Sequence, residues 1–355
     1  MKPIHILFNA WADRNSVNAQ NLNARDVAVR LDPKRFVVSM FCQNEPDPRL
    51  VGRSNIRLIR IPKRLGSFKI LHHMLGHYDA IFYLRIGRAD SVYRWLRGKG
   101  CGSKPIITPI ESPVNVLDNY PRYLRCYYDE MFKITAAAVA NSQYVADTVK
   151  ERYKVDLPVI YSGVDVNYFG SLSSKCQQRE VSVRVVFAGT LQERKHPELV
   201  LDAAGRWPDV EFVVIGDGPL KSLLMHRITA EKLTNVCLMS TKEYSEYAEL
   251  LATSDIFFFP SRVEGLAKVL LEAAACGIPA LVFDDYQTPS VVDGLTGFEV
   301  KTFEEMMNRL QLLIEERDLR LKMGNAAKEH VKKFDWEVIV KQWEDVFEKT
   351  IKRKT

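Results

Sequence analysis

The sequence predicts an α/β protein built from two doubly wound domains. Its 355 residues exceed what one ordinary core holds, and 46% hydrophobic with 26% charged residues is typical of a soluble globular protein. Short apolar runs alternate with segments of helical spacing, and this alternation begins twice, at residue 4 and again at residue 183. Alternating strands and helices favour a parallel sheet with helices on both faces, so each half of the chain is expected to form one such domain.

The first half opens with a strand, a polar loop, a helix and a second strand. Residues 4–8 are a short apolar run, and Ala24, Ala28 and Leu31 share one face of a helix expected over residues 18–31. Further strands are expected over residues 36–41, 80–84, 105–110 and 136–141, and Ser142 is a suitable N-cap for the helix that follows. Ligands of such sheets bind at the carboxyl ends of the strands, so the loops there are candidate binding loops.

The second half repeats the alternation after a polar segment, residues 170–179, where we place the linker. Strands are expected over residues 183–188, 210–215, 236–239, 256–259 and 280–283, and helices over residues 303–333 and 336–352. The strand expected over residues 210–215 is followed by the turn Gly216-Asp217-Gly218-Pro219, which alone is weak evidence for a ligand site.

One strand-to-helix turn in the second half has the features of a phosphate site. The apolar run 256–259 stops at a proline, and a helical apolar pattern follows it. A tight turn here leaves the amides of residues 265–268 at a helix N-terminus, which favours a phosphate through its N–H groups and its dipole. Glu264 stands at the mouth of the turn, and Glu272 follows about 12 Å further along the helix axis. The competing interpretation is a surface helix with an ordinary Glu264–Lys268 ion pair.

The whole stretch resembles the donor-site signature of the GT4 family of retaining glycosyltransferases, E-G-x6-E-A-x-A-x-G-x-P. Every position is filled, by Glu264, Gly265, Glu272, Ala273, Ala275, Gly277 and Pro279. The resemblance implies the GT-B fold, with two Rossmann-like domains facing across a cleft. It implies an acceptor-side domain in residues 1–170, joined by a C-terminal helix over residues 336–355, and a nucleotide-sugar donor domain in residues 171–335.

Other segments resemble the family with some departures. Residues 158–169 are similar to its v-i-p-N-G-V-D segment, and residues 334–336 to its f-s-W segment. Within a segment similar to G-R-L…E-K-G, Lys195 matches the phosphate-binding lysine, whereas Thr190 stands where relatives have an arginine. Because a leaving diphosphate needs cations, we expect Arg194 to supply the missing one.

The resemblance implies a set of site residues. Glu264 would bind the transferred sugar, while Lys195 and Arg194 would stabilise the leaving diphosphate. Glu111 stands near the position of a family histidine that faces the sugar, and the competing interpretation is a loop carboxylate that caps a turn. The donor-binding positions implied are Gly189, Thr190, Gly216, Asp217, Gly218, Ser261, Gly265, Leu266, Ala267, Lys268 and Glu272, and Ser16 and Asn18 lie in a loop expected to meet the acceptor or a phosphate.

The implied reaction transfers a sugar from a nucleoside-diphosphate sugar to a hydroxyl acceptor with retention, as in the hexosyltransferase class. A UDP-sugar is favoured as donor and a GDP-sugar comes next, in glycolipid, lipid-linked oligosaccharide or surface polysaccharide biosynthesis. No cofactor or metal is expected, because the sequence contains no D-x-D. Two alternatives stay open: a non-catalytic nucleotide-sugar-binding partner subunit, and a GT-B nucleotide-sugar epimerase or hydrolase.

Charge is unevenly distributed along the chain. Residues 1–160 hold 25 Lys and Arg against 14 Asp and Glu, although the whole chain carries only +6. The most basic segment, residues 49–71, has Leu65 and Phe68 among its basic residues, so it is expected to contact an anionic membrane. The competing interpretation is a solvated edge strand and loop, and nucleic acid is not expected because no binding motif accompanies the charge.

The expected location is the cytoplasm, and a peripheral location on the inner face of the membrane stays open as the alternative. No apolar run approaches the roughly 20 residues that span a bilayer, and the six cysteines are scattered without a C-x-x-C pair. His73 and His77 have the i,i+4 spacing of metal ligands but lack an obvious third ligand, so a metal site is disfavoured.

Overall fold

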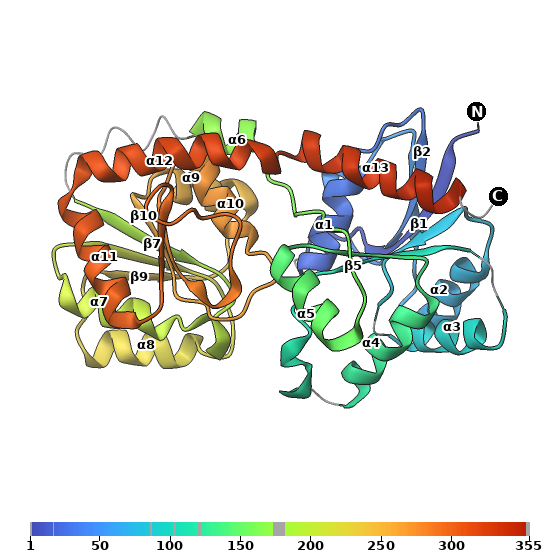
Figure 1. The fold of residues 1–355 in the computed structure, drawn as a ribbon, viewed down its shortest axis with the longest axis horizontal. Helices are drawn as coiled ribbons and strands as arrows, with labels where there is room; N and C mark the ends of the chain where they lie inside the picture. Colours follow the sequence, from blue (N-terminus) through green and yellow to red (C-terminus); the bar gives the residue numbers. More distant parts are fainter. Residues whose placement is uncertain are drawn as a thin grey trace. The chain divides into compact units, whose positions relative to one another are not determined.

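The protein consists of two compact α/β units (Figure 1). The computed structural model describes residues 2–16, 18–85, 87–101, 104–119, 122–172 and 182–352. Unit 1 comprises residues 1–162 and 336–355, and unit 2 comprises residues 163–335. Each unit holds one six-stranded sheet, which confirms the predicted class of two doubly wound α/β domains. Most of the predicted linker, from residue 173 onward, lies outside the described residues.

The sheet of unit 1 has the strand order β3-β2-β1-β4-β5-β6, and every neighbouring pair is parallel. Its strands are β1 (Ile4–Trp11), β2 (Phe36–Cys42), β3 (Ile56–Arg60), β4 (Ala80–Phe82), β5 (Ile106–Ile110) and β6 (Ala137–Ala140). The order reverses between β1 and β4. Loops leave the sheet in opposite directions at such a switch point and open a crevice at the carboxyl ends of the strands.

Helices cover both faces of this sheet. Alternate residues of β1 enter two separate cores, because Ile6 and Phe8 belong to one buried cluster and Leu7 to the other. The first cluster includes residues of α1 (Ala19–Ala28) and α13 (Trp336–Lys352). The second includes residues of α2 (Gly66–Leu75), α3 (Arg88–Gly98), α4 (Arg122–Ile134) and α5 (Gln143–Tyr153). These four helices therefore share one face of the sheet.

The last helix completes the core of unit 1. On α13, the Trp343 and Phe347 rings lie 5.1 and 5.0 Å from the ring of Phe82 on β4. Glu344 on the same helix accepts a hydrogen bond of 2.8 Å from Arg35, which precedes β2. Residues more than 250 positions apart in the chain thus pack into one core.

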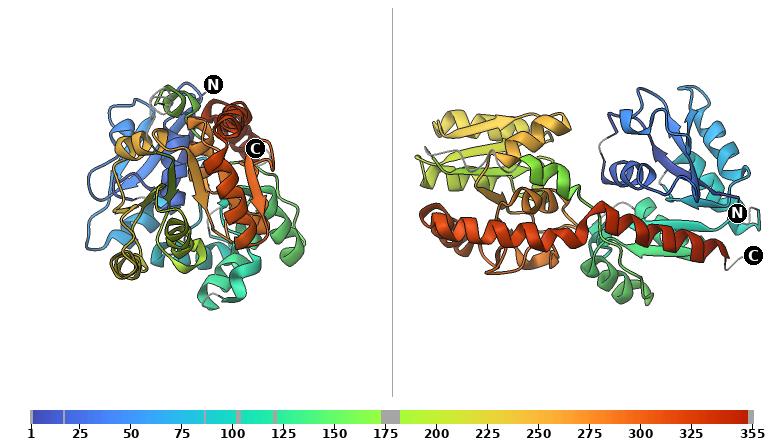
Figure 2. Two further views of the ribbon diagram at one scale, coloured as in Figure 1. Left: turned by 90° about the vertical axis from the view of Figure 1, so that its left-hand side faces the viewer. Right: turned by 90° about the horizontal axis from the view of Figure 1, so that it is seen from above.

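Unit 2 repeats the architecture with the strand order β12-β11-β10-β7-β8-β9, again parallel throughout. Its strands are β7 (Arg184–Ala188), β8 (Glu211–Ile215), β9 (Val236–Met239), β10 (Ile256–Phe259), β11 (Ala280–Phe283) and β12 (Gly297–Val300). Its helices are α6 (Val166–Leu172), α7 (Glu198–Arg206), α8 (Lys221–Ala230), α9 (Tyr244–Ala252), α10 (Lys268–Cys276), α11 (Phe303–Glu315) and α12 (Arg317–Val331). Figure 2 shows helices on both faces of this sheet as well.

Several element bounds differ from the sequence-based expectation. The single helix expected over residues 303–333 is interrupted at Glu316, whose ψ of 86° is not helical. The Arg320 side chain donates to the carbonyl oxygens of Leu313 and Ile314 at 2.6 and 2.9 Å, which satisfies two acceptors at the end of α11. Strand β4 ends at Phe82 rather than at residue 84, because Tyr83 has a φ of 69°.

Candidate functional site

The first part of the candidate site lies at the switch point of unit 2. Strands β7 and β10 are neighbours there, and the loops that follow them leave from the same edge of the sheet. A short 3-10 helix, Glu193–Lys195, lies in the loop after β7, and residues 260–267 connect β10 to α10. Predicted site residues from both loops therefore come together.

Glu264 is the centre of this arrangement. Its side chain is buried, and its Oε1 accepts a hydrogen bond of 2.6 Å from the Ser261 hydroxyl and one of 3.0 Å from Arg194 Nη1. The same oxygen forms an ion pair with Lys195 Nζ. The structure thus brings together four residues that the sequence analysis predicted separately, and two of them carry positive charge.

Lys195 is a buried cation with few partners. Its Nζ lies 4.7 Å from the centroid of the Phe259 ring at the end of β10, in addition to the ion pair with Glu264. Burial lowers the pKa of Lys195 below its usual range, and the Glu264 carboxylate opposes that shift. Perturbed charged groups of this kind are typical of functional sites. By contrast, Arg194 is partly exposed and also donates to the carbonyl oxygen of Val263 at 2.7 Å.

The glycines after β7 and β8 allow two backbone segments to approach closely. Gly189 N donates to Ile215 O at 3.0 Å, and Leu191 N donates to Asp217 O at 3.0 Å. A Cβ on Gly216 would collide with the carbonyl oxygen of Gly189, so only glycine fits there. The weak G-x-G signal of the sequence therefore marks a backbone crossing beside the loop that holds Lys195. Thr190, in the same loop, is exposed.

Asp217 links two neighbouring loops. Its carboxylate accepts from Lys221 Nζ at 2.5 Å and from the backbone N of Thr241, after β9, at 2.7 Å. These hydrogen bonds, that from Lys221 first, lower the pKa of Asp217. The side chain is thus used to position the loops after β8 and β9.

The N-terminus of α10 lies next to Glu264. The helix begins at Lys268, and its N-cap residue Ala267 has no side chain that could accept from the first-turn amides. Gly265, Leu266 and Ala267, which were predicted to contribute phosphate-binding amides, are buried and precede the helix, and the backbone of Ala267 is extended. The helix therefore begins at Lys268, directly after the three residues whose amides were predicted to bind phosphate.

Glu272 lies on the next turn of α10 and is buried. Its Oε2 accepts a hydrogen bond of 2.8 Å from the hydroxyl of Tyr247 on α9. Burial, with the nearby Glu272 charge, raises the pKa of Tyr247 well above its usual range, so the phenol stays protonated and can donate. Tyr247 was missed by the sequence analysis, because no local pattern links residues 25 positions apart.

The predicted residue Glu111 lies in unit 1, at the carboxyl end of β5. Its Oε1 accepts from the Tyr83 hydroxyl at 2.8 Å and from Asn23 Nδ2 at 2.7 Å, and Asn23 also donates to Ser162 Oγ at 3.3 Å. Asn141 Nδ2 donates to the backbone oxygen of Glu111 at 3.2 Å. The Oδ1 atoms of Asn23 and Asn141 are buried without a hydrogen-bond partner among the described residues. This polar cluster lies where the strand order of unit 1 reverses.

Tyr83 belongs to this cluster and was not predicted from the sequence. A positive φ is rare for an aromatic residue, and such strain is commonly found at functional positions. Burial raises the pKa of Tyr83 well above its usual range, so its hydroxyl remains a donor to Glu111.

The predicted loop residues Ser16 and Asn18 serve local structure. The Asn18 side chain accepts from Asn21 N at 2.9 Å as the N-cap of α1, and Ser16 O accepts from Arg25 Nη1 at 3.1 Å.

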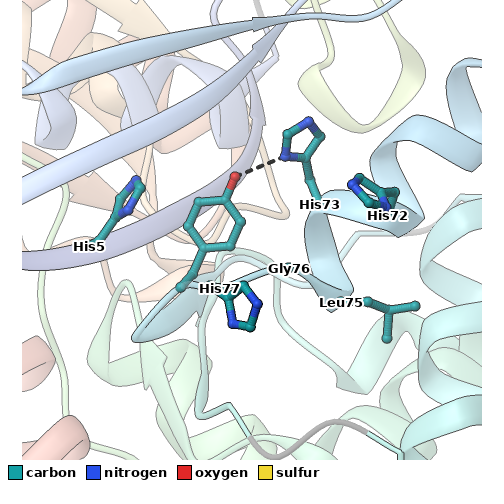
Figure 3. A pocket seen from close by; sticks show the side chains of 7 residues that line it. His5, His72, His73, Leu75, Gly76 and His77 are labelled. Atoms are coloured by element: carbon teal, nitrogen blue, oxygen red, sulfur yellow. Dashed lines mark hydrogen bonds between the residues drawn. The ribbon is translucent and has the colours of Figure 1, made fainter.

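The histidines of unit 1 line a surface hollow (Figure 3). His73 Nδ1 lies 2.9 Å from the hydroxyl of Tyr78, and His72 and His77 also line the hollow. Within the described ranges, no three His, Cys, Asp or Glu side chains lie close enough together to hold a metal ion.

Comparison with known proteins relates unit 2 to a family. Residues 173–330 match the family described as Glycosyl transferases group 1. The chain is 29% identical over 158 residues to the sulfoquinovosyl transferase SQD2 of Arabidopsis thaliana. The aligned region covers 43% of this chain and 30% of that protein. It is 32% identical over 142 residues to a second protein, the GDP-mannose-dependent monoacylated alpha-(1-6)-phosphatidylinositol monomannoside mannosyltransferase of Corynebacterium glutamicum. This aligned region covers 37% of each of the two chains. The chain thus spans only about a third of the length of these two curated relatives.

The solved structures extend the similarity to both units. HepE of Anabaena, in complex with UDP and glucose, superimposes with a TM-score of 0.80 at 18% identity, over 98% of this chain and 100% of that one. At this identity the likeness concerns the fold, and it confirms the predicted GT-B fold. The family match confirms the predicted resemblance to group 1 glycosyltransferases.

Proposed function

We propose, from the match of residues 173–330 to the glycosyl transferases group 1 family, that the protein is a retaining glycosyltransferase. It would move a hexose from a nucleoside-diphosphate sugar to a hydroxyl acceptor. The observation that carries this proposal is the cluster at the switch point of unit 2. There, the buried carboxylate of Glu264 meets the cations Lys195 and Arg194 beside the uncapped N-terminus of α10.

The chemistry of the transfer assigns a role to each of these groups. Breaking the glycosidic bond leaves negative charge on the diphosphate, and preorganised cations stabilise charge that develops in a transition state. Lys195 and Arg194 supply those cations, and the first-turn amides of α10 bind a phosphate. A bound diphosphate would compete with Glu264 for the two cations, which leaves the carboxylate available to accept from hydroxyls of the transferred sugar.

The remaining groups fit the rest of the donor and the acceptor. Glu272, oriented by Tyr247, accepts from ribose hydroxyls, because a fixed carboxylate makes strong charge-assisted hydrogen bonds. Glu111 in unit 1 accepts from a hydroxyl of the sugar or of the acceptor. The acceptor oxygen bonds to the anomeric carbon on the face from which the diphosphate leaves, so the configuration is retained, and the leaving phosphate takes the acceptor proton in place of a protein base.

The donor is proposed to be a UDP-sugar, with a GDP-sugar as the second choice. The solved HepE structure contains UDP, whereas the Corynebacterium relative is named as GDP-mannose-dependent. A thermal-shift panel of UDP-, GDP- and ADP-sugars tests this choice. A ligand at a hundredfold excess over its Kd stabilises the folded state by about 2.7 kcal/mol, so we expect one base to raise the Tm by roughly 5 °C or more. No shift with any of them would contradict the proposed function.

A binding subunit without catalytic activity is the second candidate. It is favoured by two departures from the family pattern. Thr190 stands where relatives have an arginine, and Ser290 stands where they have a glutamate directly before a segment that residues 291–297 resemble. Ser290 is buried, and its Oγ has no hydrogen-bond partner among the described residues. Release of nucleoside diphosphate from the bound sugar nucleotide separates the two candidates, because a binder shifts the Tm without turnover. The third candidate, an epimerase or hydrolase, would form its product without any acceptor.

We expect activity to survive removal of divalent metal ions. Lys195 and Arg194 already supply positive charge next to the proposed diphosphate site, and the sequence contains no D-x-D. Turnover should therefore be unchanged in EDTA. Loss of turnover in EDTA that Mg²⁺ or Mn²⁺ restores would show that the cations of the protein do not suffice.

A lipid-linked acceptor and peripheral contact with the cytoplasmic face of a membrane belong to the same proposal. No described helix is long and apolar enough to cross a bilayer. Within the segment 49–71 that was predicted to meet lipid, one basic residue already has partners in the protein. Arg49 Nη1 and Nη2 bind Asp26 and Asp47, both at 2.8 Å, so this exposed arginine is already paired within unit 1.

A further inference from the structure

Exposed apolar side chains gather on two helices of unit 1. Leu65, at the start of α2, is 72% exposed, Phe68 on α2 is 71% exposed, and Trp95 on α3 is 64% exposed. Leu75 and Val92 on the same helices are also exposed. Single exposed apolar residues are ordinary, but a cluster of large ones marks an interaction surface.

These side chains lie on one side of the molecule. Leu65, Phe68 and Leu75 are spaced at helical intervals along α2, and Val92 and Trp95 are spaced likewise along α3. The opposite sides of both helices enter one core, since Met74 and Tyr93 belong to the same buried cluster. Figure 1 shows α2 and α3 side by side. We call the outward side of the two helices, with residues 63–65 before α2, the α2–α3 face.

The charge of this face is strongly positive. Five of the eight basic residues in residues 61–100 are exposed, namely Lys63, Arg64, Lys69, Arg88 and Lys99, whereas Arg94 pairs with Glu130 on α4. The acidic residues of the same segment are Asp79 and Asp90. Asp90 is buried and accepts from Asn9 and from Arg85 N at 2.6 and 3.1 Å, so it does not face outward. Lys63, Arg64 and Lys69 are exposed and form no ion pair within the described part of the chain. Their charges are therefore available to an external anion.

We propose that the α2–α3 face docks on the surface of an anionic lipid bilayer. Phe68 and Trp95 enter the boundary between headgroups and acyl chains, where aromatic side chains are favoured, while Lys63, Arg64 and Lys69 bind the headgroups. A nucleic acid would use the positive charges but would leave Leu65 and Phe68 in water. The proposed contact surface thus lies on α2 and α3, whereas the sequence predicted a contact along residues 49–71. It concerns the partner of the proposed glycosyltransferase, but it does not depend on sugar transfer.

Vesicle co-sedimentation tests the proposal on the whole chain. Phosphatidylcholine vesicles that contain phosphatidylglycerol should bind the protein, and pure phosphatidylcholine vesicles should not. Changing Lys63, Arg64 and Lys69 together to Gln should lower the binding constant about fivefold for each charge removed. Changing Phe68→Ser with Trp95→Ser should lower it by about tenfold or more. Binding should also fade with salt, because the Debye length shrinks from about 10 Å at 0.1 M to about 3 Å at 1 M.

A matched control lies on α8 of unit 2. Leu223 and Met225 are 51% and 56% exposed, so Leu223→Ser with Met225→Ser removes a similar apolar area elsewhere and should leave vesicle binding unchanged. Trp95 fluorescence should shift to the blue on the anionic vesicles, and Trp95→Phe should abolish that shift while binding persists.

Three outcomes would overturn the proposal. They are equal binding to neutral vesicles, equal loss of binding in the α8 variant, and loss with the charge variant but not with the Phe68 and Trp95 variant. The last result would mean that charge alone attaches the protein to the vesicles, without entry of Phe68 and Trp95 into the bilayer. None of these outcomes bears on donor binding, so the thermal-shift panel can succeed or fail independently.

Discussion

Changing Glu264 to Gln should lower sugar transfer by about 10² to 10³-fold and should not weaken binding of the nucleoside diphosphate. The variant keeps the shape of the side chain but removes the charge that Lys195 and Arg194 now neutralise. The transferred sugar loses its charged hydrogen-bond acceptor, which costs transition-state stabilisation. The two cations become more available to the diphosphate, so its affinity should stay equal or rise. Turnover of the sugar nucleotide and calorimetry with the free diphosphate measure the two quantities.

Glu193 provides a matched control for Glu264. It is also a glutamate, it lies in the same loop as Lys195, and it is exposed. Glu193→Gln should change neither rate nor affinity. Thermal unfolding must accompany the assay, since removing the partner of a buried charge destabilises a protein by about 3–5 kcal/mol. If the folded Glu264 variant kept the wild-type rate, or lost more than about tenfold in diphosphate affinity, the proposed contact with the sugar would be wrong.

Changing Glu272 to Gln should weaken nucleoside diphosphate binding by about 1–3 kcal/mol, which is roughly 5- to 150-fold. The buried carboxylate is expected to accept from the ribose hydroxyls, and an amide accepts a weaker bond in the same place. Tyr247→Phe is the companion variant, because it removes only the 2.8 Å hydrogen bond that orients Glu272. It should cost about 1 kcal/mol, less than the loss of the charge itself.

Inorganic pyrophosphate separates the ribose contact from the phosphate contact. It has no ribose, so both variants should bind it as well as the wild-type protein does. Equal losses for pyrophosphate and for the nucleoside diphosphate would mean that Glu272 acts through the phosphate site or through stability.

The parts of the site that could be predicted are those encoded locally. The turn after β10, the spacing of Glu264 and Glu272 and the lysine after β7 all lie in short segments, where strand ends and helical periodicity are visible. Their meeting at the switch point follows from the parallel order of the sheet. The fold class could be predicted for the same reason, because it depends on alternation rather than on individual contacts.

The contacts that were missed join distant residues. Tyr247 reaches Glu272 over 25 positions, and Asn23 reaches Glu111 over 88. The backbone conformation of Tyr83 is likewise set by what it packs against, since a positive φ is intrinsically unfavourable for tyrosine. The ion pair of Arg49 with Asp26 was missed for the same reason, because Asp26 lies on another element, 23 positions earlier in the chain.

The placement of α13 has a consequence for the order in which the protein folds during synthesis. Unit 2 is one continuous stretch, residues 163–335, whereas unit 1 needs the Trp343 and Phe347 side chains of the last helix to fill its core. Domains generally fold as the ribosome releases them, from the N-terminus onward. Here unit 2 can complete its core before unit 1 does. Until α13 has been synthesised, the apolar surface of residues 1–162 that α13 covers stays exposed. That surface is where a chaperone would bind the nascent chain.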